Sequence, residues 1–131
     1  NADALRDSRA DEATIDWSDG SVETDEHPAA IDHPNMSRLR ATMSAHLGVL
    51  RDEEGMRQAL KLIIDMEQTA HSPRFKNVLT TAKLIAVSAL KRLESRGGHA
   101  RTDYPNEIAA LKKRSFVTLE ESQASIAELL P

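Results

Sequence analysis

The chain has 131 residues, a length that suits one hydrophobic core and is short for two. Aromatic residues make up only 3% of it, so the core must be filled by aliphatic side chains and methionine, which pack well between helices. The absence of cysteine excludes disulfides, thiolate metal sites and cysteine nucleophiles, and it agrees with a cytoplasmic location. No run of about 18 apolar residues and no signal-peptide pattern is present, so no membrane association is predicted.

The net charge of -4 is unevenly distributed. Residues 1–35 hold ten acidic and two basic residues, a net charge of -8, whereas residues 36–131 have a net charge of +4. We therefore expect residues 1–35 to be an acidic linker or arm and residues 36–131 to be the folded domain, with a weak attraction between the two. Because the chain begins with Asn1 and not Met, we also expect it to be a piece of a longer polypeptide.

The acidic segment has few apolar residues and is typical of a linker. Asp19-Gly20 lies between the β-prone runs TIDWS and SVET, which is the pattern of a two-residue hairpin turn. Such a hairpin would place Trp17 opposite Val22. Both alternatives, a hairpin and an irregular arm, stay open on the sequence.

Helical periodicity begins at residue 36. Apolar residues at steps of three and four predict a first helix over 36–47 and a second over 53–70, the latter with Asp52 as its N-cap. Ser72-Pro73 is typical of a helix start and opens a third helix. Its predicted core side is Phe75, Leu79, Ala82, Ile85, Ala86, Ala89 and Leu93, with Lys83, Lys91 and Arg92 largely on the other side.

The third helix is predicted to end at Arg96, with Gly97 in the left-handed conformation that terminates helices. Residues 107–113 could form one or two helical turns, and residues 115–119 are expected to be extended. Thr118 and Glu121 form a capping-box pattern that opens a last helix to about Leu130. The predicted fold class is all-α: an up-down-up, spectrin-repeat-like bundle of three helices, a short additional C-terminal helix and an irregular acidic N-terminal segment.

No catalytic, cofactor-binding or metal-binding residues can be assigned from the sequence. The histidines form no i, i+4 pair or HExxH motif, and the glycines form neither GxGxxG nor a phosphate-binding loop. The helical part lacks a basic stripe with interleaved aromatics, so no nucleic-acid partner is expected. No nucleophile motif such as GxSxG occurs.

The stretch LESRGGHARTDYP, residues 93–105, is rich in polar groups. In one interpretation, His99, Arg101 and Asp103 share one side of an extended loop and bind an anion or move a proton. In the other, Arg96 and Arg101 pair with carboxylates such as Glu94 or Asp103, His99 bonds a backbone carbonyl, and Tyr104-Pro105 turns the chain back onto the core. Its many polar groups favour docking on a surface that lies outside this chain.

The segments LRATM, LGVLRDEEGM, QALKLI and NVLTTAKLIAVSALKRLESRGGHARTDYP occur in this order over residues 36–105. Together they resemble the C-terminal helical domain of the succinate dehydrogenase and fumarate reductase flavoproteins, the family that includes L-aspartate oxidase. The most specific element is ESRGxHxRxDYP, which follows a long Ala-rich helix headed by Asn77. The turn over 48–52 and the short tail look more like the L-aspartate oxidase branch. The matching positions are Glu94, Ser95, Arg96, Gly97, His99, Arg101, Asp103, Tyr104 and Pro105.

The resemblance implies a parent enzyme that uses FAD to oxidise L-aspartate to iminoaspartate in NAD biosynthesis. It implies that the FAD-binding and capping domains of the same polypeptide are the partners of this chain. The chain itself would be a structural docking domain, inactive alone and without bound FAD. The motif would lie near the domain interface, so substitutions of Arg96 or Arg101 should disturb docking more than the stability of the chain. The alternatives are the C-terminal domain of a succinate dehydrogenase or fumarate reductase flavoprotein, and an independent helical interaction module.

Overall fold

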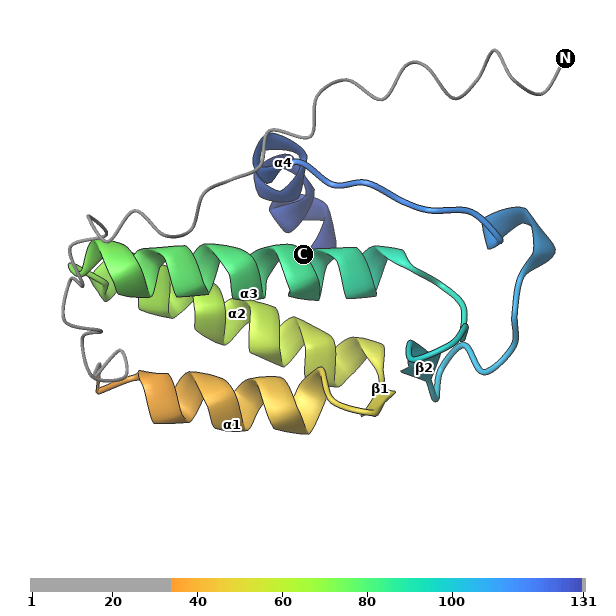
Figure 1. The fold of residues 1–131 in the computed structure, drawn as a ribbon, viewed down its shortest axis with the longest axis horizontal. Coiled ribbons are helices and arrows are strands. Elements are labelled where there is room, and N and C mark those ends of the chain that lie inside the picture. The colour runs from red at the N-terminus through yellow and green to blue at the C-terminus, as the bar shows by residue number, and fades with distance from the viewer. Residues whose placement is uncertain (1–33, 131) are drawn as a thin grey trace, which may run out of the picture.

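The computed structural model describes residues 34–130 and shows a mostly helical fold with a small two-stranded sheet (Figure 1). The predicted hairpin around Asp19-Gly20 lies outside these residues, as does most of the predicted acidic arm. No helix of the described part is long and apolar enough to cross a membrane. The elements in chain order are α1 (Met36–His46), β1 (Leu50–Arg51), α2 (Glu53–Thr69), α3 (Pro73–Lys91), β2 (Ala100–Arg101), the 3-10 turn η1 (Ala109–Leu111) and α4 (Leu119–Leu129).

Three helices begin where side chains satisfy the free amide groups of the first turn. The Asp52 carboxylate accepts a hydrogen bond from the Gly55 amide at 2.8 Å, and Ser72 Oγ accepts one from the Phe75 amide at the start of α3. Thr118 and Glu121 form a complete capping box at the start of α4. These three predicted starts are confirmed.

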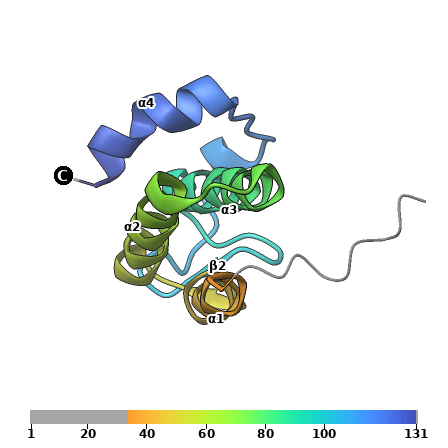
Figure 2. The same ribbon diagram turned by 90° about the vertical axis from the view of Figure 1, so that its left-hand side faces the viewer.

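Each helix packs against the next helix along the chain. Helix α2 packs on both α1 and α3, and α4 covers the side of α3 that faces away from α1 (Figures 1 and 2). After α3 the chain turns back so that β2 pairs in parallel with β1, with Arg51 opposite Arg101. It then passes through η1 and returns along α3 to α4 (Figure 1).

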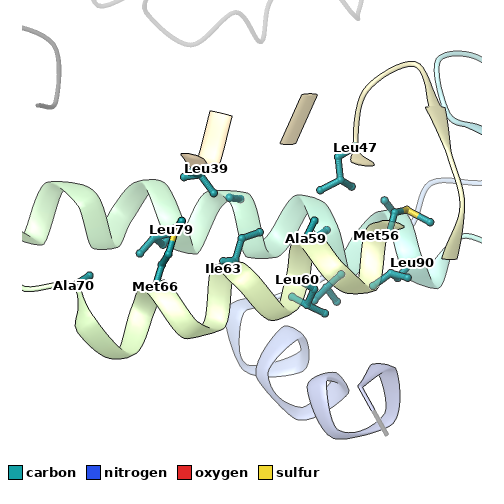
Figure 3. Packing of buried hydrophobic residues seen from close by; sticks show 14 of the residues in the cluster. Leu39, Leu47, Met56, Ala59, Leu60, Ile63, Met66, Ala70, Leu79 and Leu90 are labelled. Atoms are coloured by element: carbon teal, nitrogen blue, oxygen red, sulfur yellow. The ribbon is translucent and has the colours of Figure 1, made fainter. Parts of the chain in front are cut away.

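The core lies between α1, α2 and α3 and is built from aliphatic side chains, methionines and one phenylalanine (Figure 3). Met56, Leu60, Ile63, Phe75 and Leu79 are completely buried. Helix α2 supplies apolar residues at positions 56, 59, 60 and 63, the spacing that puts them on one face of a helix. Aliphatic side chains and methionines thus fill a core that contains few aromatic rings.

Three features of α3 and the residues directly after it differ from the prediction. The helix ends at Lys91 and not at Arg96, because Arg92 already has an extended backbone. Lys83, predicted on the side away from the core, is 5% exposed, because α2 and α4 cover it and its ammonium lies 2.7 Å from both Glu67 carboxylate oxygens. Conversely Ile85 and Leu93, predicted as core residues, are 46% and 42% exposed.

Residues 34–130 form a mostly helical fold with four helices, which agrees with the predicted all-α class at this coarse level. The parallel pair of two-residue strands was not predicted. Residues 107–113 form one 3-10 turn, as the sequence allowed.

Candidate docking surface at the Glu94–Pro105 motif

The motif begins directly after α3 and folds back on the end of that helix. The Ser95 hydroxyl fixes this fold-back, since Ser95 Oγ lies 2.8 Å from the Arg101 amide and 2.8 Å from the Tyr104 carbonyl oxygen. The Ser95 amide donates to the Asn106 carbonyl. One short side chain therefore holds both halves of the motif together.

Glu94 is completely buried and is surrounded by donors. Arg96 donates to both of its oxygens at 3.0 Å, Arg92 donates to one of them, and the Ile108 amide donates to the other at 2.8 Å. The hydrogen bonds from Arg96, together with those from Ile108 and Arg92, lower the pKa of Glu94 to about 2, against the opposing effect of burial. Glu94 thus ties the chain after α3 to the segment that leads into η1.

Gly97 and Gly98 form a tight turn between Arg96 and His99. Gly97 has a φ of 57°, a backbone conformation that disfavours side chains with a Cβ. The amides and carbonyls of Arg96 and His99 bond to each other across the turn. The left-handed conformation predicted for Gly97 is present, but it serves this turn and not the end of α3.

His99 is held by both ring nitrogens. Arg51 donates to Nδ1 at 3.0 Å, which leaves Nε2 to donate to the Arg92 carbonyl at 3.1 Å. Burial lowers the pKa of His99, and the positive charges of Arg51, Arg101 and Arg92 lower it further, while the bond to the Arg92 carbonyl acts in the opposite direction. His99 is therefore a neutral imidazole placed among cations.

Arg101 is 2% exposed and is the largest fully buried side chain of the described part. Its guanidinium donates to both Asp103 oxygens, at 2.9 and 2.6 Å, and to the Leu90 carbonyl at 3.0 Å. The guanidinium also lies over the Tyr104 ring, 4.6 Å from its centre. Arg101 thereby satisfies a carbonyl at the C-terminal end of α3, where a positive charge is favoured.

Asp103 links this cluster to α2. Its Oδ2 accepts a hydrogen bond from the Glu53 amide at 2.9 Å, at the N-terminal end of α2 where a negative charge is favoured. The hydrogen bonds from Arg101, with a smaller effect of the Glu53 amide, lower the pKa of Asp103 to about 2. The Arg101–Asp103 pair therefore joins the end of α3 to the start of α2.

This arrangement does not support acid–base catalysis. Glu94 and Asp103 stay ionised near neutral pH because their pKa values are about 2. Both nitrogens of His99 are engaged within the motif. The contacts instead match the second interpretation of the sequence: Arg96 pairs with Glu94, Arg101 pairs with Asp103, and His99 bonds a backbone carbonyl.

The burial of Glu94 and Arg101 changes the expectation for these residues. Because both bind groups of this chain, substitution of Arg101 should first destabilise the chain itself, contrary to the sequence-based expectation. The members that remain at the surface are Gly97, Gly98, Thr102, Asp103 and Pro105.

The described residues do not fit a flavin or a metal ion. The paired strands have two residues each, and the Gly97-Gly98 turn connects a bridge between Arg96 and His99 and does not open a helix that could cradle a pyrophosphate. Among residues 34–130, no group of three or more histidine or carboxylate side chains could hold a metal ion.

Sequence reasoning missed Arg51 and Arg92 as parts of this cluster. Arg51 could not be found from the sequence, because it lies 48 residues before His99. The pairings of Glu94 with Arg96 and of Arg101 with Asp103 were part of one sequence-based interpretation. The residues of each pair are two positions apart and share one side of an extended segment.

Residues 67–127 match the family described as "Fumarate reductase flavoprotein C-term". The chain is 50% identical to the L-aspartate oxidase of Rhodospirillum rubrum over 88 residues, which cover 67% of this chain and 32% of that protein. It is 42% identical to the L-aspartate oxidase of Caulobacter vibrioides and 39% to that of Pyrococcus horikoshii; each match covers 63% of this chain, but 15% and 16% of the relatives. No solved structure matches the chain significantly. The chain thus spans about a third or less of the length of these relatives.

The environment of His99 predicts a pH dependence of stability. Because its folded-state pKa is lowered, the unfolded chain binds a proton more readily at this position as the pH falls below about 6.5. We expect the free energy of unfolding to decrease between about pH 7 and pH 5, and to decrease less steeply in His99→Gln. Denaturant unfolding at several pH values measures this, with the exposed His71→Gln as control. Parallel curves for wild type and His99→Gln would contradict it.

Proposed function

We propose that the chain is the C-terminal part of an FAD-dependent L-aspartate oxidase, with a C-terminal helical domain of the fumarate reductase flavoprotein family. The observation that carries the proposal is the 50% identity with the L-aspartate oxidase of Rhodospirillum rubrum across 67% of this chain. Such an enzyme removes two electrons from L-aspartate to give iminoaspartate and reduces FAD, which then passes the electrons to oxygen or fumarate. This is the first step of NAD biosynthesis in bacteria, and we propose a cytoplasmic location.

Within that enzyme we propose a structural role for this chain. In the motif, Glu94, His99 and Asp103 are engaged with neighbouring groups of the chain. In this proposal the FAD and the catalytic residues belong to the flavin-binding and capping domains of the same polypeptide. The chain packs against these domains, and on its own it is inactive and binds no FAD. The motif contributes in two ways. Its buried members Glu94 and Arg101, with the partly buried Arg96, His99 and Tyr104, hold its shape, and its exposed members form the contact.

An assay of the full-length parent protein tests the activity. We expect L-aspartate-dependent formation of hydrogen peroxide in air, or of succinate when fumarate is the acceptor, and no oxidation of succinate beyond background. A parent that oxidises succinate and not aspartate would instead be a succinate dehydrogenase or fumarate reductase flavoprotein. A protein with no flavin would favour an independent helical module. The purified 131-residue chain alone should show no flavin absorbance.

Gly98 offers a separate test of docking. A Cβ added at Gly98 meets nothing within 4 Å, and Gly98, unlike Gly97, has no positive φ. We therefore expect Gly98→Glu to leave the melting temperature of the 131-residue chain nearly unchanged, while it lowers the melting temperature and the flavin retention of the parent.

The control is Ala127→Glu, which adds the same side chain at an exposed position of α4, outside the motif. It should leave both proteins nearly unchanged. If Gly98→Glu and Ala127→Glu behave alike in the parent, the motif is not a docking surface, whatever the activity assay shows.

A further inference from the structure

Residues of α1 and α3 together line a groove. Figure 2 shows these two helices with α2 to one side of them. The groove has a volume of about 600 Å³, and it is lined by Met36, Leu39 and Met43 from α1 and by Val78, Ala82 and Ile85 from α3, with polar residues at its rim. A second hollow of about 440 Å³ shares Thr81 and Ile85 with it and continues to Arg92 and His99. The two hollows thus lie next to each other along α3.

The two helices that border the groove carry no acidic residue. Arg38 and Arg40 lie on α1, and Arg74 and Lys76 lie on α3. The two other lysines of this helix are engaged elsewhere, since Lys91 bonds Ser125 on α4 and Lys83 is buried against Glu67. Arg40 lines the groove and forms no ion pair within residues 34–130. Acidic residues of the described part occur instead on helices such as α2 and α4. An occupant of this groove should therefore combine apolar side chains with negative charge.

The segment that precedes α1 has this composition. Residues 1–33 hold ten acidic and two basic residues, and their apolar residues include Ile15, Trp17, Val22 and Ile31. The segment joins α1 at Met36, which itself lines the groove. Thirty-three extended residues reach roughly 100 Å, whereas a helix of 19 residues such as α3 is about 28 Å long. The connection is thus more than long enough, and covalent attachment gives the segment a high effective concentration at the groove.

We propose that residues 1–33 of this chain occupy the groove between α1 and α3, with their apolar residues against Met43, Val78 and Ile85 and their carboxylates near Arg40. The proposal concerns contacts within this chain and does not rest on the proposed oxidase activity. It makes the acidic segment a cover of the helical domain, and not only a passage to another domain.

The absence of cysteine allows a direct measurement of this contact. A nitroxide label on a single cysteine introduced as Ser21→Cys broadens the amide signals of residues near it in the NMR spectrum of the full 131-residue chain. We expect broadening of Arg40 and Ser44 on α1 and of Thr81 and Ile85 on α3. Signals of the outer side of α4, such as Ala127, should stay sharp. Reduction of the nitroxide provides the reference spectrum.

Ile85→Glu tests the groove itself. Ile85 is 46% exposed, so a glutamate there can reach solvent without unfolding α3, but it places a negative charge where the acidic segment would lie. We expect the broadening of α1 and α3 to be lost in Ile85→Glu and kept in Ala127→Glu. Because the attraction is partly electrostatic, high salt should also reduce the broadening in the otherwise unchanged chain.

Uniform broadening of all amide signals, or no broadening of the signals at the groove, would overturn the proposal. A mixture of spin-labelled chains with separate isotope-labelled chains distinguishes a second copy. If broadening of α1 and α3 appears in that mixture at the same strength, the contact is between molecules and the proposal fails. If it appears only when both labels are on one chain, the proposal is supported.

Discussion

The fold depends on a buried cation that must be paired. Arg101 has almost no contact with solvent, so its charge is tolerated only because Asp103, carbonyl oxygens at the end of α3 and the Tyr104 ring surround it. The same Asp103 accepts a hydrogen bond from the first amide of α2. One ion pair therefore places a positive charge at the C-terminal end of α3 and a negative charge at the N-terminal end of α2, as both helix dipoles require. Removal of Asp103 leaves the buried Arg101 with carbonyl oxygens, the Tyr104 ring and the more distant Glu53 carboxylate at 3.9 Å.

This pairing explains why the motif is rich in ionisable groups that are engaged with one another. A catalytic site needs groups that can change protonation or contact a substrate, and here the carboxylates of Glu94 and Asp103 are fixed as anions by arginines. His99 lies between Arg51 and a carbonyl and keeps β2 and the end of α3 in place. The polar residues hold an exposed glycine turn in one position. Such an arrangement makes the surface around the turn rigid.

Sequence reasoning succeeded where the decisive contact is local. The caps at Asp52, Ser72 and Thr118 join residues three positions apart, and these helix starts were predicted correctly. The sequence-based prediction was wrong where contacts between distant segments determine the structure. The end of α3 is set partly by Arg101, which bonds the Leu90 carbonyl from 11 residues away, so the glycines gave a misleading boundary. Likewise the burial of Lys83 depends on Glu67 and on the cover of α4, which no periodicity in α3 reveals.

A double-mutant cycle on Arg101 and Asp103 tests the central claim most directly. Arg101→Met and Asp103→Asn, alone and together, are compared by denaturant unfolding of the 131-residue chain. We expect a coupling free energy above about 1 kcal/mol, because the pair is partly shielded and joins two helices. A solvent-exposed ion pair between residues four apart on a helix sets the comparison, since such pairs typically give about 0.5 kcal/mol or less. Effects of Arg101→Met and Asp103→Asn that simply add would contradict the claim that this pair holds α2 and α3 together.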